Sequence, residues 1–246
     1  MLLTLRGRPS ANLNFQTSYT FSRAKSNIES GTRFDQDNPQ AGGVAGQNIP
    51  DLGAYSSYYA DANYDVRHRL SLSAVYTLPG LRSGVGRVLT SGWELTSIAA
   101  IQSGTPFWVV CSGPLSCDYN NDGLGYDIPE RPTTDFTGSH SRQQFKNGIF
   151  TLADFAAPTS GQEGSLPRNI YRNPGYLQID ASVLKNNKIP WIGEQGNLQF
   201  RFDFLNVLNR ANLGGVDNNM ADVGSFGTVH SALSGRQIQL GVRVSF

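Results

Sequence analysis

The sequence lacks any hydrophobic run long enough to cross a membrane as a helix. No stretch approaches 18 consecutive apolar residues, which excludes a transmembrane helix. A strand of a membrane barrel needs an apolar residue only at every second position, so a mean hydropathy of −0.32 does not exclude the membrane. The N-terminal MLLTLRGRPS also lacks the basic and apolar regions of a secretory signal. If the protein is a membrane barrel, we therefore expect its true N-terminus to lie upstream of this chain.

Charge and catalytic residue types are also scarce. Charged residues make up only 16% of the chain, and the net charge of +1 gives no electrostatic reason to expect nucleic acid. The three histidines, His68, His140 and His230, lie far apart, and no spacing resembles a catalytic triad or a phosphate-binding loop. These absences argue against an enzyme and against a nucleic-acid-binding protein.

The sequence does contain repeated alternation of apolar and polar residues, which is typical of β-strands. Five segments alternate strictly: residues 13–22, 68–78, 177–183, 198–204 and 236–246. A sixth strand is expected over residues 92–103, with a bulge where Ile98 breaks the pattern, and a short seventh over residues 2–6. We therefore predict an all-β protein of six or seven antiparallel strands, forming a single domain over residues 1–246.

Strand length and connection length favour a transmembrane barrel. About 10 residues at ~3.3 Å each, tilted by ~40°, cover roughly the 25 Å of a barrel's lipid-facing band. Residues 24–66, 104–176 and 210–235 are long connections, whereas residues 79–91 and 186–196 form shorter ones. Outer-membrane barrels have long extracellular loops and short periplasmic turns, so the alternation of lengths predicts a periplasmic C-terminus.

The alternation also predicts which side chains face lipid and which face the barrel interior. The set expected to face lipid comprises Phe15, Leu72, Ile179, Phe200, Phe202, Leu240 and Val242. Their neighbours Gln16, Ser73, Asp180, Arg201, Gln239 and Arg243 are expected to face the interior. Aromatic girdles are expected at the outer interface from Tyr19, Phe21, Phe107, Trp108 and Tyr176, and at the inner one from Tyr76, Trp93 and Phe246.

Two other architectures fit alternating strands. A soluble β-sandwich that binds a ligand such as carbohydrate has apolar inner and polar outer faces. The polar positions here carry Gln, Ser, Asn, Thr, Arg and Asp rather than Lys or Glu, which suits a hydrated interior better than a sandwich surface. A small outer-membrane pore or adhesion barrel is the second alternative, although seven strands fall below the eight of the smallest common barrels.

The same segments resemble the C-terminal barrel region of TonB-dependent transporters of the Oar-like group. The resemblance rests on LNFQTSYTFSRA, NYDVRHRLSLSAVYTLP, GWELTSIAAIQSGTPF, DYNNDG before ERP, PRNIYRNPGYLQIDASVLKN, LQFRFDFLNVLNRANL and FGTVHSALSGRQIQLGVRVSF. It implies a 22-stranded barrel in the bacterial outer membrane that takes up a ligand, with an N-terminal plug and energy supplied by the TonB complex. This chain would provide about seven of those strands, and it contains neither plug nor TonB-contacting segment.

The last residues resemble the terminal assembly signal of outer-membrane barrels. The pattern consists of Gln239 (polar), Gly241, Val244 (apolar) and the final aromatic Phe246. An edge strand with unpaired backbone donors can be captured by strand addition, so this segment predicts the barrel-assembly machinery as a partner, besides outer-membrane lipid. The alternative is an ordinary final strand that ends in an interfacial aromatic residue.

Two further sites are expected in the longest connection. Cys111 and Cys117 could form a local disulfide, because the extracellular surface is reached through an oxidising periplasm; two reduced thiols are the alternative. The segment DYNNDG, from residue 118, repeats the opening of a calcium loop, with Asp118, Asn120 and Asp122 at alternate positions. Pro129 stands where an EF-hand needs a bidentate Glu, so Asp127 is the candidate fourth ligand. The alternative is an Asx-rich turn without metal.

Overall fold

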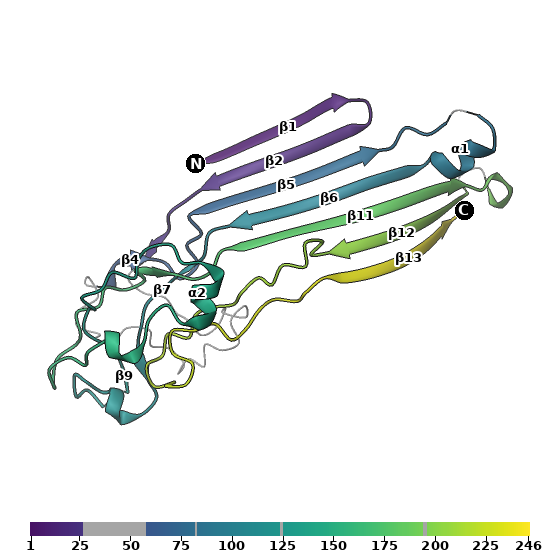
Figure 1. Ribbon diagram of the computed structural model, residues 1–246. Coiled ribbons are helices and arrows are strands. Elements are labelled where there is room, and N and C mark those ends of the chain that lie inside the picture. Colours follow the sequence, from purple (N-terminus) through teal and green to yellow (C-terminus); the bar gives the residue numbers. More distant parts are fainter. Residues whose placement is uncertain (27–57, 82, 124, 194–195) are drawn as a thin grey trace.

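The computed structural model describes residues 1–26, 58–81, 83–123, 125–193 and 196–246. One seven-stranded antiparallel sheet dominates it (Figure 1). Its strands, in spatial order, are β1 (Leu2–Ser10), β2 (Leu13–Phe21), β5 (His68–Thr77), β6 (Trp93–Gln102), β11 (Tyr176–Lys188), β12 (Asn197–Leu205) and β13 (Gln237–Ser245). Each long strand pairs with the long strands next to it in the chain, so the sheet is a meander.

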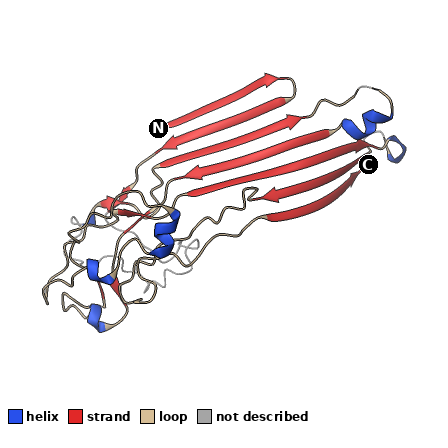
Figure 2. Cartoon of the chain, in the orientation of Figure 1, coloured by secondary structure: helices blue, strands red, loops and turns tan. Residues whose placement is uncertain are grey.

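The two ends of the sheet differ in their connections. We call the end from which residues 22–67, 103–175 and 206–236 leave the strands the loop end, and the opposite end the turn end. The loop end carries α2 (Arg142–Asn147) and the short strands β3 (Lys25–Ser26), β4 (Ala60–Asp61), β7 (Pro106–Phe107), β8 (Cys111–Ser112), β9 (Tyr126–Asp127) and β10 (Tyr171–Arg172). The turn end carries α1 (Val85–Thr90), as Figure 2 shows. No helix of the described residues is long and apolar enough to cross a membrane.

The strand registers keep apolar side chains on one face of the whole sheet. Directly paired residues of an antiparallel sheet share a face. Tyr19 pairs with Leu70, Leu70 with Ile101, and Ile101 with Leu177, so one row of such residues crosses four strands. Near the C-terminus, Phe202 pairs with Val183 on one side and Leu240 on the other. The seven residues predicted to face lipid and the six predicted to face the interior therefore lie on opposite faces of one sheet.

Two sequence-based expectations about this sheet were wrong. The register runs through Ile98 without a shift, so the expected bulge is absent there; Ile98 simply occupies the polar face. β1 extends to Ser10, beyond the expected end at residue 6. The register of its pairing with β2 shifts between Gly7 and Ser10. The sandwich, which was the alternative to the barrel, does not fit the structure, since every other sheet of the described residues has only two strands and cannot cover the apolar face of the large sheet.

The sheet does not close into a barrel within the described residues. β1 pairs only with β2, and β13 pairs only with β12, so each lies at an open edge. Figure 1 shows these two strands at opposite sides of the sheet. An open edge presents unpaired backbone N–H and C=O groups, which can accept another strand.

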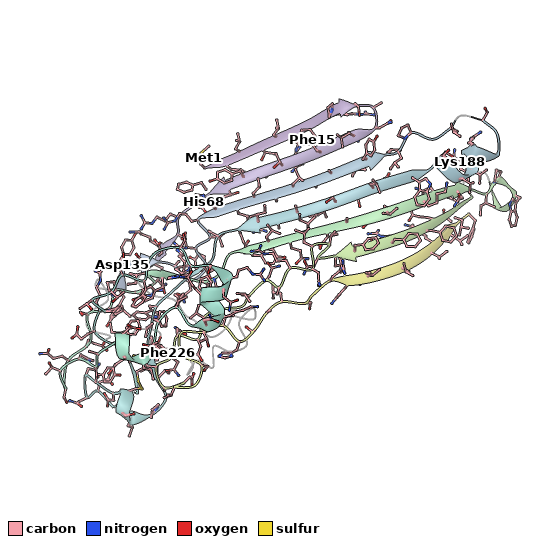
Figure 3. All side chains as sticks on the ribbon, viewed as in Figure 1. Met1, Phe15, His68, Asp135, Lys188 and Phe226 are labelled. Atoms are coloured by element: carbon pink, nitrogen blue, oxygen red, sulfur yellow. A yellow bond between two sulfur atoms is a disulfide. The ribbon has the colours of Figure 1, made fainter. Side chains whose placement is uncertain are left out.

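The described parts of the long connections at the loop end pack into a compact assembly. Its centre is Phe150, whose ring lies 5.0 Å from that of Phe226 and 5.7 Å from that of Tyr171. The buried residues around it are Phe107, Val109, Phe145, Ile149, Phe155, Leu166, Val216 and Val229. Phe107 therefore belongs to this core, and Trp108 packs against Tyr58 in a second cluster, so neither contributes to an interfacial girdle. Figure 3 shows Phe226 in this assembly and Lys188 at the turn end.

Candidate functional site

The apolar face of the seven-stranded sheet is an extended exposed surface of the described residues. Several of its side chains are exposed, including Leu240 (73%), Val242 (66%) and Leu72 (37%). A continuous apolar face of this size is not stable in water and requires an apolar cover. Alternating apolar and polar faces on strands of nine to thirteen residues match the lipid-facing band of an outer-membrane barrel.

One lysine lies on the apolar face, and its ammonium group is hydrogen-bonded locally. Lys185 pairs with Trp93 and Phe200 near the turn end, and it is only 9% exposed. Its ammonium donates hydrogen bonds to the carbonyl oxygens of Val88 (2.7 Å) and Ser91, at the C-terminal end of α1, where a positive charge is favoured. The ammonium also lies 5.5 Å from the centre of the Trp93 ring. The charge thus sits beneath a helix at the turn end rather than in mid-membrane.

The opposite face carries hydrogen-bonded polar side chains. The Ser182 hydroxyl donates to Asp203, and the Nε of Arg201 lies 2.8 Å from the same carboxylate. Farther toward the loop end, the Gln178 amide donates to Asp180 at 2.9 Å. Polar groups that satisfy one another in this way suit the hydrated interior of a barrel.

A network of ion pairs ties the loop end to the sheet, and sequence reasoning missed it. The carboxylate of Asp65 is fully buried and accepts from a guanidinium nitrogen of Arg172 at 2.8 Å. The same nitrogen lies 2.7 Å from Asp61, which also binds Arg23 and Arg67. Although burial acts to raise the pKa of Asp61, its arginine partners, Arg23 foremost, lower it below the usual value. Aspartate and arginine are common in polar loops, and Arg23 and Arg172 lie far in sequence from the two aspartates, so no local pattern predicts the network.

The two cysteines are joined in the structure. The Cys111 and Cys117 sulfurs are bonded, with Cα atoms 5.1 Å apart, and both side chains are buried. Cys111 also pairs with Asp127 across the β8–β9 ladder. The disulfide and this ladder together hold the base of the acidic segment that begins at Asp118.

The structure does not gather the predicted calcium ligands. Among the described residues, no group of three His, Cys, Asp or Glu side chains is placed to hold a metal ion. The Asp118 carboxylate accepts the backbone N–H groups of Asp122 (3.0 Å) and Gly123 (2.9 Å), and the Asn120 side chain accepts that of Asp122 at 2.9 Å. Such bonds are typical of Asx-rich turns. Calcium binding at this turn stays a prediction.

A pair of carboxyl groups lies beside this turn. Asp127 is fully buried and accepts the backbone N–H groups of Tyr119 and Asn120 through one oxygen. Glu163, which the sequence analysis did not single out, reaches the same place from a distant segment. Burial, reinforced by the neighbouring Asp127 carboxyl group, raises the pKa of Glu163 to about 8. Glu163 therefore favours its protonated form beside the Asp127 carboxyl group.

This pair predicts a pH dependence of the acidic turn. A raised pKa in the folded state means that folding favours the protonated form. The stabilisation is complete below the ordinary pKa of 4.5 and is lost as the pH rises to about 8.

In wild type, hydrogen exchange of residues 111–128, corrected for intrinsic rates, should accelerate between pH 5 and pH 8. Glu163→Gln should abolish that acceleration by removing a penalty on the order of 1 kcal/mol at pH 8, a figure discounted for solvent screening. Asp135→Asn, at an exposed turn, serves as the control, and an unchanged pH response in Glu163→Gln would contradict the prediction.

The four residues of the predicted assembly signal lie in or next to β13. Gln239 and Gly241 lie on its polar face, opposite Asp203 and Arg201 of β12. Val244 lies on the apolar face opposite Leu198. Phe246 follows the strand, is 92% exposed, and therefore contributes little to packing within the chain.

Comparison with known proteins agrees with this architecture. A family model described as outer membrane beta barrel domain matches residues 1–239, which cover the long strands from β1 to β12 and the first three residues of β13. No curated protein and no solved structure matches the chain. The match extends over nearly the whole chain, and the two-faced antiparallel sheet is the structure that such a domain requires. The chain therefore belongs to the outer membrane beta barrel domain family, and it is a protein of the bacterial outer membrane.

Proposed function

We propose that this chain is the C-terminal part of the barrel of a TonB-dependent transporter of the Oar-like group, which takes up a ligand across the outer membrane. The observation that carries the proposal is the open seven-stranded sheet with one continuous apolar face. A sheet of seven strands requires further strands to close, and 22 is the number that the resemblance implies. In this proposal, the missing strands and plug belong to the upstream part of the protein, and the TonB complex acts through that part. The role is transport and not catalysis.

The proposed orientation places the loop end outside the cell and the turn end in the periplasm. It is supported by the difference in connection length, because outer-membrane barrels have short periplasmic turns and long extracellular loops. The connections at the turn end comprise residues 11–12, 78–92 and 189–196, whereas residues 103–175 leave from the loop end. The packed assembly at the loop end would then be the surface that a ligand meets first.

The reading frame upstream of Met1 tests the proposal against the alternative of a small pore. An in-frame segment that encodes a plug domain and a TonB-contacting segment would support the transporter. A stop codon directly upstream, combined with a folded product of this length in the outer membrane, would refute it. Closure would then have to occur between copies of the chain, since an isolated sheet of seven strands retains two open edges.

Removal of Phe246 should reduce assembly rather than stability. Because the side chain is almost fully exposed, its loss removes few contacts, whereas the assembly machinery is proposed to capture the strand that ends there. We expect several-fold less folded barrel in the outer membrane of cells that produce the full-length protein without Phe246. Heat-modifiable gel migration of the membrane fraction measures it. Trp191→Ala, which removes another exposed aromatic at the turn end, is the control, and equal losses in both variants would count against a terminal signal.

A further inference from the structure

A pocket of about 250 Å³ lies at the loop end, where β6 and β11 end. Ile101 and Leu177 line it, and these two residues pair directly with each other on the apolar face. β12 does not extend this far, since its first partner on β11 from the loop end is Ala181. α2 and residues 210–213 border the pocket instead. The pocket is therefore formed partly by the lipid-facing side of the barrel wall.

The height of the pocket corresponds to the membrane interface. Ile101 and Leu177 belong to the row that continues through Leu70 to Tyr19 on β2. Next to this row, the Tyr19 hydroxyl forms a 2.7 Å hydrogen bond with Nδ1 of His68, and the ring of Phe21 contacts His68. Amphipathic aromatic residues gather where the hydrocarbon meets the headgroups. The pocket thus lies where a lipid headgroup would be.

The walls of the pocket combine apolar and basic side chains. Phe145 and Leu213 join the two strand residues, while His140, Arg142 and Arg210 supply the basic groups. None of the described residues that line the pocket is acidic, and neither arginine forms an ion pair with any described residue. Arg142 donates one bond, at 2.6 Å, to the carbonyl oxygen of Ala211. The Nε of Arg210 is buried and has no hydrogen-bond partner among the described residues.

We propose that this pocket binds the phosphorylated headgroup of a membrane lipid, with an acyl chain along Ile101 and Leu177. Arginine guanidinium groups bind phosphate oxygens through paired hydrogen bonds, and the positive charges of Arg142 and Arg210, which form no ion pair among the described residues, favour an anionic ligand. The apolar residues of the same pocket favour a lipid over a soluble phosphate compound. The assignment to the outer leaflet rests on the proposed orientation, but the binding itself does not.

Native mass spectrometry of the full-length protein in detergent, titrated with bisphosphorylated lipid A, tests the proposal. Wild type should bind lipid A, and dephosphorylated lipid A should bind at least about tenfold more weakly, the effect of losing one charged contact. Arg142→Gln with Arg210→Gln should weaken lipid A binding by a similar factor. Arg243→Gln is the matched control, because Arg243 pairs with Gln199 on the polar face near the turn end, away from the pocket.

The possible results distinguish a lipid ligand from a soluble anion, and a loss of binding from a failure of the variant to fold. Equal binding of both lipids, or unchanged binding in the double variant, would overturn the proposal. Displacement of lipid A by millimolar inorganic phosphate would also overturn it, in favour of a soluble anion. If the double variant does not fold, as judged by gel migration, the exposed Arg142 is replaced alone, with the same expected direction. Because binding is measured in detergent, a failed transporter or orientation proposal leaves this result unaffected.

Discussion

Replacing Leu72 with arginine should destabilise the folded barrel by about 2–4 kcal/mol, the cost of a basic residue at the midplane of a barrel's lipid face. Leu72 lies in the middle of β5 on the apolar face, where it pairs with Thr17 and Ala99. Neither of these partners has an acidic side chain that could compensate the introduced charge. Urea unfolding of the full-length protein in detergent or lipid vesicles measures the change.

The adjacent residue provides a control at the same depth. Ser73 lies on the polar face, where it pairs with Gln16 and Ile98, so an arginine there can extend into the hydrated interior. Ser73→Arg should therefore change the free energy of unfolding by less than about 1 kcal/mol. A similar loss of stability in the two variants would mean that the Leu72 face does not contact lipid any more than the Ser73 face does. The assignment of the apolar face to lipid would then be wrong.

Replacing Asp65 with alanine should destabilise the loop assembly by about 2–3 kcal/mol, somewhat less than the loss of one partner of a fully buried ion pair. The substitution leaves Asp61 as the remaining carboxylate partner of Arg172 among the described residues, and it removes the acceptor of the Ala24 backbone N–H. Asp65→Asn keeps an acceptor oxygen and should recover part of the loss. Hydrogen exchange of residues 58–67 and 168–173 in the full-length protein reports the opening of this network.

Asp135 supplies the control for this experiment, because its carboxylate is exposed and, among the described residues, accepts hydrogen bonds only from Thr137 in its own turn. Asp135→Ala should leave exchange in the two reporter segments unchanged. Acid provides a second readout. Since the folded pKa of Asp61 is lowered, its stabilisation persists above pH 3.8 and is lost as the pH falls through the lowered value. Unchanged hydrogen exchange of both reporter segments in Asp65→Ala would show that the ion pairs do not hold the loop end together.

The strands could be predicted from sequence because they obey a local rule. Alternation of residues such as Phe200 and Arg201 reports the two faces directly, and one slip in register would have moved every side chain to the other face. Ile98 misled the prediction for the same reason: an apolar residue on the interior face looks like a shift of register. Its backbone nonetheless pairs regularly on both sides.

The loop end could not be predicted, because its contacts join distant segments. Phe107 looks like an interfacial aromatic when only its distance from a strand is considered, yet Phe150 and Tyr171 bury it from elsewhere in the chain. The role of Glu163 beside Asp127 depends on the same kind of contact. The acidic segment that begins at Asp118 could not be assigned for a different reason: its local sequence pattern fits both a calcium loop and a hydrogen-bonded turn.

The hydrogen bonds at the base of the longest connection have a kinetic consequence. Joining Gln102 to Tyr176 through a flexible loop would cost roughly 1 kcal/mol more in closure entropy than joining Thr77 to Glu94. The backbone N–H of Asn173, however, donates to Thr105 at 2.9 Å, and Tyr171 pairs with Phe107 directly above. Once these contacts and the aromatic core beyond them have formed, the ends of β6 and β11 are separated by only a few residues, counted through the contacts rather than along the whole loop. A connection that is long in sequence then behaves, for the pairing of the two strands, as a short hairpin turn.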